Sequence, residues 1–193
     1  MIARTKHNLR ARLRQARKSI SGPQRARATK AINRRLLELS LPKSVATVGV
    51  YAAIGSEVCI DEAIQHWIAA GHRIAWPRVE GAGDMVFCCA GPDSLVLSSM
   101  GIKEPSLEHP IVPIETMDLL VVPGIGFDRF GGRLGQGGGF YDRALAEHDS
   151  SLRTVGVAFS VQVTPLIPTE TTDRQVGIVL TERGLARAGR WSL

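Results

Sequence analysis

The sequence predicts an α/β fold with three α/β/α layers, in which a mostly parallel, Rossmann-like sheet follows two N-terminal helices. Three observations support this prediction. Short runs of apolar and β-branched residues alternate with helical segments through the middle and end of the chain. Two amphipathic segments precede the first such run, and the connections are short, which favours right-handed parallel crossovers. With 193 residues, we expect one domain over residues 1–193, with residues 1–40 forming a basic helical head packed on it.

The first two elements are helices. Residues 4–20 place one apolar stripe at spacings of three and four, formed by Leu9, Leu13, Ala16 and Ile20. The break after them is Ser21-Gly22-Pro23, in which Ser21 can cap the next helix. That helix is predicted from Gln24 to Leu39, and its core-facing residues are Ala28, Ile32, Leu36 and Leu39.

These helices carry most of the unbalanced positive charge. Residues 1–35 contain twelve of the 24 Lys and Arg residues and no Asp or Glu, and the first 50 residues contain no Phe, Tyr or Trp. We expect the polar faces, opposite the apolar stripes, to hold Lys6, Arg10, Arg14 and Arg17, then Arg27, Lys30 and Arg34. A solvated face, phosphate binding and nucleic-acid binding are all compatible with this pattern. Lys6 and Arg10, four residues apart, can reach one polyanion, whereas RNA binding usually adds stacking aromatics.

The elements after the head alternate between strands and helices. Val45–Ala53 is the first predicted strand, and Ile60–Ala70 is a helix that Gly71 ends. Its inward residues are expected to be Ile60, Ile64, Trp67 and Ile68. Further strands are predicted at Arg73–Trp76, which Pro77 closes, and at Met85–Cys89, Asp118–Val122, Arg153–Phe159 and Val176–Leu180. A looser stretch runs through Pro105, and a helix is predicted at Phe140–Glu147.

A glycine-rich loop follows the Asp118–Val122 strand. Glycine fills half of the sixteen positions from Gly124 to Gly139, among the charges Asp128, Arg129 and Arg133. Such density costs backbone entropy, so it indicates that the backbone approaches something closely. Exposed N–H groups, an arginine and a following helix N-terminus would together hold an anion such as phosphate. The loop matches neither the Walker pattern nor G-x-G-x-x-G, so a P-loop NTPase or a nicotinamide enzyme is not supported.

Ligands of parallel sheets bind at the carboxyl ends of strands. Glu57, after the first strand, and the glycine loop, after a later one, are therefore expected to open onto the same edge. Glu57 is either a helix cap or a buried acceptor, for the N–H edge of a heterocycle or for a proton that leaves an amine.

The remaining composition excludes several classes. Three cysteines, an odd number without C-x-x-C spacing, are expected to be buried reduced thiols. The histidines form no metal motif, and no apolar run is long enough to span a membrane. Because the N-terminus lacks the apolar segment of a signal peptide, we expect a cytoplasmic protein.

Residues 118–143, DLLVVPGIGFDRFGGRLGQGGGFYDR, resemble the DxxxVPGxxFDxxGxRLGxGxGYYDR signature of the 5-formyltetrahydrofolate cyclo-ligases, also called 5,10-methenyltetrahydrofolate synthetases. Shorter matches in the same order extend the resemblance over nearly the whole chain: Lys6-x-x-Leu9-Arg10, Gly55-Ser56-Glu57-Val58, Trp76-Pro77-Arg78-Val79, Met85-Val86-Phe87, Gly101-Ile102-Lys103-Glu104-Pro105 and Thr169-Glu170-Thr171-Thr172-Asp173.

The resemblance implies an enzyme that uses ATP and Mg2+ to convert 5-formyltetrahydrofolate to 5,10-methenyltetrahydrofolate, with release of ADP and phosphate. The formyl carbon is a poor electrophile, so its oxygen would be phosphorylated before N10 closes the ring. The protein's task would then be placement and charge neutralisation.

The resemblance also implies site residues. ATP would be bound by Lys6, Arg10, Arg133, Leu134, Gly135, Gln136, Gly137, Gly138, Gly139, Phe140 and Tyr141. Folate would contact Glu57 and residues 136–140, where substrate and γ-phosphate would meet, with Met85 and Phe87 as walls of the pterin pocket. Arg133 and Tyr141 would be catalytic, with Tyr141 orienting the formyl oxygen or stacking on the pterin. Asp142 would bind Mg2+, with Asp173 as a second ligand or outer partner.

Four positions depart from the family pattern: Gln136, Phe140, Thr172 and Gly177. Two alternative functions stay open. One is an ATP-dependent ligase or kinase acting on another heterocycle, and the other is nucleic-acid binding by the basic head. The expected partners are 5-formyltetrahydrofolate and ATP, with no nucleic acid, no membrane and a monomeric state.

Overall fold

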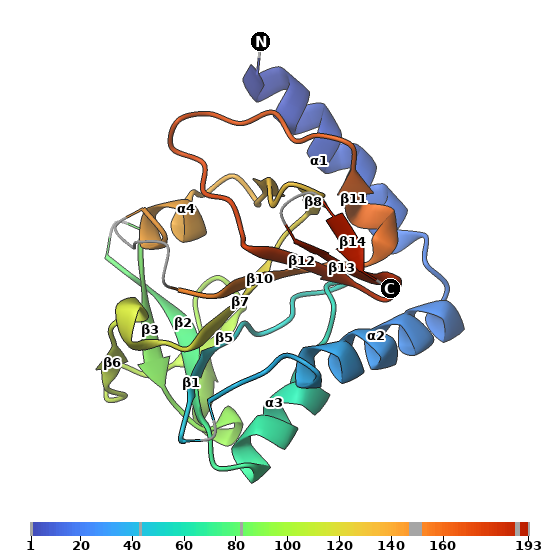
Figure 1. Cartoon of the computed structure of the whole chain (residues 1–193). Coiled ribbons are helices and arrows are strands. Elements are labelled where there is room, and N and C mark those ends of the chain that lie inside the picture. The colour runs from blue at the N-terminus through green and yellow to red at the C-terminus, as the bar shows by residue number, and fades with distance from the viewer. Residues whose placement is uncertain (1, 43, 82, 147–151, 188–189, 193) are drawn as a thin grey trace.

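The computed structural model describes the chain except for residues 1, 43, 82, 147–151, 188–189 and 193 (Figure 1). Its main feature is a nine-stranded sheet with the order β14-β13-β12-β10-β7-β1-β2-β3-β6. The central strands, β12 to β2, pair in parallel, and the outer strands pair antiparallel. The predicted α/β class with a parallel centre is therefore confirmed.

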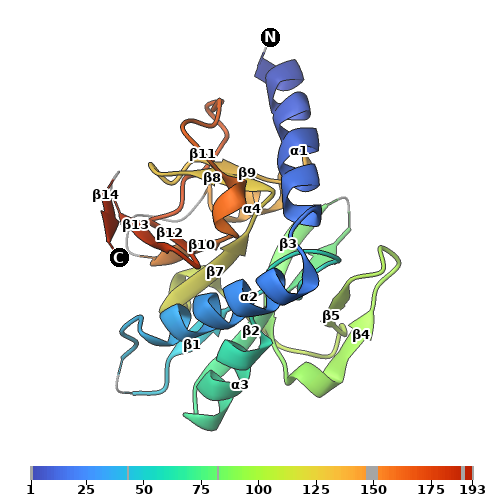
Figure 2. The same cartoon turned by 90° about the vertical axis from the view of Figure 1, so that its right-hand side faces the viewer.

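The parallel centre consists of β1 (Thr47–Gly49), β2 (Arg73–Glu80), β7 (Leu119–Pro123), β10 (Thr154–Val157) and β12 (Ile178–Thr181). The antiparallel strands are β3 (Asp84–Cys89), β6 (Ile111–Val112), β13 (Gly184–Arg187) and β14 (Arg190–Ser192). A separate hairpin pairs β4 (Leu95–Leu97) with β5 (Lys103–Pro105), beside the end of the sheet that carries β3 (Figure 2).

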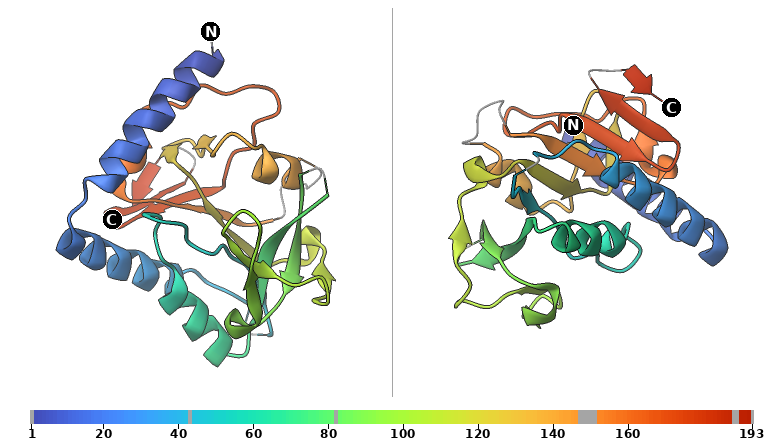
Figure 3. Two further views of the ribbon diagram at one scale, coloured as in Figure 1. Left: turned by 180° about the vertical axis from the view of Figure 1, so that it is seen from behind. Right: turned by 60° about the horizontal axis from the view of Figure 1, so that its bottom comes forward.

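Alternating side chains of the central strands fill two cores. Leu119 and Val121 of β7 pack with α2 (Gly22–Leu37) and α3 (Asp61–Ala69), which lie on the same face of the sheet (Figure 3). Leu120 and Val122 face the other way, towards a core that includes residues around the short helix α4 (Phe140–Ala144). This two-residue alternation is what a buried strand between two layers requires.

A buried asparagine connects the two helices of the first face. Asn33 of α2 donates from Nδ2 to the carbonyl of Cys59 at 2.9 Å, and its Oδ1 accepts the N–H of Ala63 at 2.9 Å. The start of α3 is thereby fixed against α2. Ser21 is the N-cap residue of α2 as predicted. Its side chain makes no hydrogen bond to the helix backbone, but its own backbone N–H donates to Gln24 Oε1 at 3.3 Å.

Helix α1 (Ile2–Lys18) lies over a small three-stranded sheet rather than on the main sheet (Figure 1). That sheet has the order β11-β8-β9, formed by Val163–Thr164, Gly126–Asp128 and Arg133–Leu134. Leu13 packs there with Ile125 and Leu134. A Cβ on Gly126 would come within 2.3 Å of Leu13 Cδ1, so the close approach of α1 requires glycine at that position.

The expected separation of apolar and charged faces on α1 is wrong for two residues. Lys6 and Arg17 are only 5% and 7% exposed and lie on the same side as Leu13. Positions 6, 10, 13 and 17 share one helix face because they are spaced by three or four residues. The helix also ends at Lys18, before Ile20, and Ala16 and Ile20 are only partly buried.

Several strand boundaries differ from the predictions. Strand β1 is confined to Thr47–Gly49, and β2 continues through Pro77 to Glu80. Proline is tolerated there because β1 pairs with β2 only as far as Ala75, which leaves one edge of β2 open. The hairpin β4–β5 lies in the stretch expected to be loose, and β13 and β14 were not predicted.

Three smaller expectations also need correction. Helix α4 ends at Ala144, short of the expected Glu147, which lies outside the described residues. Ile68 of α3 is 37% exposed rather than inward. Among the cysteines, Cys88 is buried as expected, but Cys59 is exposed and Cys89 is half-buried, and all three thiols are free.

Candidate active site

A cavity of about 380 Å³ lies where β1 and β7 end, between the glycine loop and the hairpin β4–β5. It is lined by Arg10, Tyr51, Ala52, Ile54, Glu57, Pro77, Val79, Met85, Met100, Ile102, Glu104, Pro123, Gly124, Arg133, Gly135, Gln136, Gly137, Gly139, Phe140, Tyr141 and Asp142. The structure thus brings Glu57 and the glycine loop, far apart in sequence, to the same edge of the sheet, as expected for ligands of parallel sheets.

The glycine loop is built around a buried aspartate. Asp128, 1% exposed, accepts the N–H groups of Phe130 and Gly132 on Oδ1, each at 2.9 Å, and that of Ile167 on Oδ2 at 2.8 Å. The sequence identifies Asp128 as a charge in the glycine loop, but not as the residue that organises it. An aspartate shortly before a glycine pair is a known turn signal, and this signal could have identified its role.

We predict that Asp128→Ala lowers the free energy of unfolding by about 3 kcal/mol, because buried N–H groups without acceptors cost about 1–3 kcal/mol each. Urea unfolding would measure the loss. The matched variant Asp128→Asn keeps one acceptor oxygen and should lose less. If wild type and Asp128→Ala unfolded at the same urea concentration, the Asp128 carboxylate would not stabilise the loop.

Arg133 brings a buried cation to the cavity. Its Nη2 lies 2.8 Å from Asp142 Oδ1, and its guanidinium carbon lies 5.4 Å from the centre of the Tyr141 ring. Its Nε is buried and has no hydrogen-bond partner among the described residues. A buried donor without an acceptor is unusual in a folded protein. Because Arg133 also lines the cavity, its guanidinium can pair with an anion that enters there.

Tyr141 presents a neutral hydroxyl to the same cavity. Burial raises the pKa of Tyr141 well above its usual value, the charge of Arg133 opposes this, and Glu57 adds to the rise. At neutral pH the phenol is therefore a hydrogen-bond donor. Phe87, expected as a pocket wall, does not line the cavity but packs edge-on against Tyr141 at 6.5 Å between ring centres. Met85 does line it.

Helix α1 holds the outer part of the glycine loop. Arg10 Nε donates to the carbonyl of Gly135 at 2.9 Å, and Arg14 Nη2 donates to Gln136 Oε1 at 2.7 Å. Gln136 Nε2 in turn lies 3.4 Å from Glu57 Oε1. The basic face of α1 is thus used within the chain, and the loop reaches across to Glu57.

Glu57 is held by two groups besides Gln136. Its Oε2 accepts the N–H of Ile54 at 3.1 Å, and its Oε1 lies 3.6 Å from Nη1 of Arg17. Burial lowers the pKa of Arg17, although Glu57 opposes that shift. The bond within residues 54–57 fits the cap-like interpretation of Glu57, while its place in the cavity fits the ligand interpretation.

Lys6 and Asp173 lie together outside the residues that line the cavity. Lys6 Nζ is 2.5 Å from Asp173 Oδ2 and 2.8 Å from Glu170 Oε2. Burial alone would lower the pKa of Lys6, but the hydrogen bonds and charges of Asp173 and Glu170 outweigh it and raise that pKa. Burial would raise the pKa of Asp173, and the bond from Lys6 outweighs it and lowers that pKa.

The pKa shifts of Lys6 and Asp173 define the pH range in which their ion pair stabilises the fold. The lowered pKa of Asp173 stabilises the fold above its unfolded value of about 4, and the raised pKa of Lys6 stabilises it below about 10. We predict that Lys6→Met costs about 2 kcal/mol of unfolding free energy, between the values for exposed and buried pairs. In urea unfolding this cost should be constant from about pH 5 to 9 and shrink below about pH 4, as Asp173 protonates. A cost that grew towards acid would exclude this interaction.

Leu134 and Phe140, two other predicted binding positions, differ in how they can contact a ligand. The side chain of Leu134 is buried with Leu13, so only its backbone can reach a ligand. Phe140 begins α4, and a Cβ on Gly138 would come within 2.6 Å of the Phe140 ring. Because α4 has five residues, its N-terminus offers less to an anion than the longer predicted helix would. Sequence reasoning missed Tyr51, Pro77, Val79, Met100, Ile102 and Glu104 as lining residues.

Asp142 and Asp173, the two predicted metal ligands, pair with different cations. Asp142 lines the cavity and pairs with Arg133, whereas Asp173 pairs with Lys6. No group of three His, Cys, Asp or Glu side chains among the described residues is placed to hold a metal ion. A carboxylate on the cavity still suits Mg2+, because this ion is commonly held by one or two carboxylates together with phosphates and water.

Comparisons with known proteins agree with this site. A family model described as the 5-formyltetrahydrofolate cyclo-ligase family matches residues 2–182. A 5-formyltetrahydrofolate cyclo-ligase of Escherichia coli (strain K12) is 30% identical over 174 residues, covering 88% of this chain and 96% of the relative. One of Mycolicibacterium smegmatis is 32% identical over 194 residues, covering 96% of this chain and 98% of the relative.

The fold has solved counterparts. An NMR structure of Aquifex aeolicus 5,10-methenyltetrahydrofolate synthetase is 30% identical, with a TM-score of 0.83 and coverage of 97% of this chain and 95% of that one. A 5,10-methenyltetrahydrofolate synthetase structure from Mycoplasma pneumoniae, 22% identical, shares the fold with a TM-score of 0.76, covering 92% of this chain and 98% of that one. The chain therefore belongs to the 5-formyltetrahydrofolate cyclo-ligase family of ligases.

Proposed function

We propose that this protein converts 5-formyltetrahydrofolate to 5,10-methenyltetrahydrofolate in the cavity between the glycine loop and Glu57, consuming ATP and releasing ADP and phosphate. The observation that carries the proposal is Arg133, a buried cation that lines a cavity together with Asp142 and Glu57. A site for an acidic polyphosphate and a heterocycle requires this combination of groups.

The chemistry explains why a phosphate site must adjoin the folate. The formyl group on N5 is an amide, so its oxygen is a poor leaving group until it carries the phosphoryl group that ATP supplies. N10 then forms the new bond to the formyl carbon, and the C–O bond breaks as phosphate leaves and N10 loses its proton. The residues contribute placement and charge neutralisation rather than covalent catalysis.

Arg133, Arg10 and the loop backbone are proposed to bind the phosphates. Arg133 and Arg10 both line the cavity, together with Gly135, Gln136, Gly137 and Gly139. Gly137 and Gly139 have φ values of +113° and +70°, a conformation that favours glycine and allows successive N–H groups to face one anion. Lys6 would join them by exchanging Asp173 and Glu170 for a phosphate oxygen.

Glu57 and Tyr141 are proposed to position the folate. A carboxylate accepts the N–H edge of a pterin. Glu57 lines the cavity, and the partners of its Oε1, Gln136 at 3.4 Å and Arg17 at 3.6 Å, are long contacts. Tyr141 can donate its hydroxyl to the formyl oxygen or stack on the pterin.

Asp142 fits the Mg2+ that the family implies, and Mg2+ would neutralise charge on the transferred phosphoryl group. Asp142 also pairs with Arg133. Binding would therefore require Asp142 to share its carboxylate between the arginine and the ion, and Asp173 would have to leave Lys6 to act as a second ligand.

The departures from the family pattern are accommodated locally. Gln136 links Arg14 to Glu57, and Phe140 lines the cavity without a hydroxyl. The N–H of Gly177 donates to Thr154 Oγ1 at 2.8 Å, so a second acid at that position is replaced by a structural contact. Nothing in the structure explains Thr172.

The basic head gives little support to the nucleic-acid alternative. Lys6 and Arg17 are buried, and Arg10 and Arg14 bind the glycine loop. Among the residues that the structure describes, no helix is long and apolar enough to cross a bilayer. A monomeric state and a cytoplasmic location remain predictions.

The test is the absorbance of 5,10-methenyltetrahydrofolate formed by purified protein from 5-formyltetrahydrofolate, Mg2+ and ATP, with ATP omitted as the control. We expect turnover only with ATP. Folded protein that releases phosphate from ATP with another heterocycle, but forms no methenyl product, would replace this function with the ligase or kinase alternative.

A further inference from the structure

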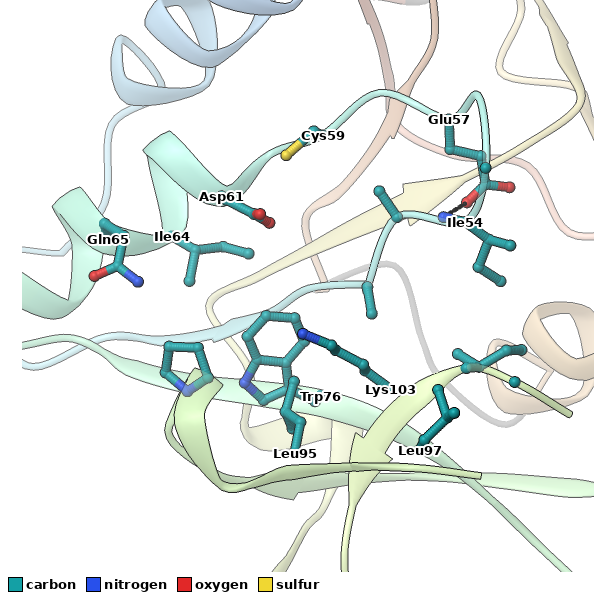
Figure 4. A pocket seen from close by; sticks show the side chains of 16 residues that line it. Ile54, Glu57, Cys59, Asp61, Ile64, Gln65, Trp76, Leu95, Leu97 and Lys103 are labelled. Atoms are coloured by element: carbon teal, nitrogen blue, oxygen red, sulfur yellow. Dashed lines mark hydrogen bonds between the residues drawn. The ribbon is translucent and has the colours of Figure 1, made fainter. Parts of the chain in front are cut away.

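Glu57 belongs to a short turn, residues 54–57, that lies beyond the end of β1 at Gly49. The N–H of Glu57 donates to the carbonyl of Ile54 at 3.1 Å, and the Glu57 carboxylate accepts the N–H of Ile54, also at 3.1 Å (Figure 4). Between them Gly55 has a φ of +58°. These bonds fix the shape of the turn but do not connect it to a strand or helix. The direction of Glu57 relative to the cavity therefore depends on contacts from other elements.

Two arginines of the helical head attach this turn through Ser56, the residue before Glu57. Arg17, in the last turn of α1, donates from Nε to Ser56 Oγ at 3.0 Å. Arg25 of α2 donates from Nη1 to the carbonyl of Ser56 at 2.7 Å and from Nη2 to the carbonyl of Arg17 at 2.8 Å. The guanidinium carbon of Arg25 lies 5.5 Å from the centre of the Phe159 ring. The end of α1, the start of α2 and the turn are thus held together.

Arg17 also faces the carboxylate of Glu57. Its Nη1 lies 3.6 Å from Glu57 Oε1, and both side chains are only 8% exposed. The attraction between two charges is stronger where little water separates them than it is at the surface. Glu57 lines the cavity, whereas Arg17 is not among the described residues that do so. Arg17 therefore lies behind Glu57 and can affect a ligand in the cavity only through the turn that carries this carboxylate.

We infer that Arg17 is a positioning residue for the proposed reaction, which fixes the direction of the Glu57 carboxylate so that it can accept the N–H edge of the pterin. The fork of the guanidinium allows this, because Nε binds Ser56 while Nη1 faces Glu57. A carboxylate held in one direction before the substrate arrives loses less entropy on binding. The inference rests on the proposed function and extends the folate site to a residue that does not contact the ligand.

The first experiment separates the two substrates. We expect Arg17→Met to raise the KM for 5-formyltetrahydrofolate about tenfold and the KM for ATP less than about twofold, as a loss of preorganisation at the folate site alone predicts. Arg17→Lys keeps the charge without the fork and should raise the first KM less. Arg35→Met is the matched control, because Arg35 is a half-buried arginine of α2 that does not line the cavity. An unchanged KM for the folate in both Arg17 variants would overturn the inference.

A second experiment distinguishes positioning of Glu57 from general support of the fold. If Arg17 acts through Glu57, Arg17→Met should change the KM for the folate little when Glu57→Gln is already present. A purely structural role would give the same fold-change in both backgrounds. That outcome would also overturn the inference.

A third readout needs neither substrate nor turnover. The N–H of Ile54 donates to Glu57 Oε2, so its hydrogen exchange reports how firmly the carboxylate is held. By NMR, we expect this amide to exchange about fivefold faster in Arg17→Met, the effect of weakening one hydrogen bond, and at the wild-type rate in Arg35→Met. Unchanged exchange in Arg17→Met would overturn the inference. Faster exchange in a protein without cyclo-ligase turnover would show that Arg17 holds Glu57 and that the proposed function alone had failed.

Discussion

Arg133→Ala is expected to raise the KM for ATP about 100-fold, with a much smaller change in the KM for 5-formyltetrahydrofolate, because hydrogen bonds to charged groups contribute about 1.5–3 kcal/mol. The arginine is buried beside the glycine loop, and its Nε has no other partner among the described residues. No flexible surface cation can replace it. Steady-state kinetics with each substrate varied in turn would measure the two constants.

The matched control is Arg129→Ala, since Arg129 lies in the same loop but is exposed and stacks on Phe130. Arg133→Lys keeps the charge but loses the fork of donors and should fall between wild type and alanine. Lys6→Ala should act in the same direction with a smaller effect, because Lys6 must first leave Asp173 and Glu170. Equal increases in both KM values, in a protein with unchanged thermal stability, would remove Arg133 from the phosphate site.

Asp142→Asn is expected to lower kcat by about two orders of magnitude, comparable to the loss of a single electrostatic group in other active sites. Two effects combine. An amide is a poorer Mg2+ ligand than a carboxylate, and the variant replaces the charged partner that lies 2.8 Å from Arg133 with a neutral one. Titration of activity with Mg2+ separates them, since loss of a ligand shifts the Mg2+ requirement whereas loss of the ion pair alone does not.

Asp173→Asn is the informative comparison for the metal. If Asp142 is the principal ligand, the Mg2+ requirement of Asp173→Asn should shift much less than that of Asp142→Asn. The reverse order would assign the metal to Asp173 and reduce Asp142 to a partner of Arg133. Because Asp173 holds Lys6, its variant should also show the altered stability predicted for Lys6→Met.

Local patterns were sufficient for the central elements of the fold. The apolar run at Leu119–Val122 is β7, and the periodic segment at Ile60–Ala70 contains α3. In both cases the hydrophobic period matches the burial that the element requires. The predictions were wrong at Pro77, which was expected to end β2, and in the stretch before Pro105, which was expected to be loose. Whether a proline or a short polar segment can join a sheet depends on which sheet edge is free.

In the candidate site, too, some residues could be predicted from local sequence signals and others could not. The glycine loop and Glu57 could be selected from the sequence, since glycine density and the position after a strand are local signals. The contacts of Gln136 with Arg14 and Glu57 could not be predicted, because these residues are far apart in the sequence and meet only in the folded chain.

By itself the sequence determined the α/β class, the position of the phosphate loop and the resemblance to the cyclo-ligase family, because periodicity, glycine content and motif spacing are properties of the chain. Only the tertiary structure decided which charges are buried. Lys6 and Arg17 lie inward with Leu13, although the sequence analysis placed them on a polar face opposite the apolar stripe. The reason is that the free energy of burying a charge depends on its partners, and Glu57, Glu170 and Asp173 are brought to α1 only by the folded chain.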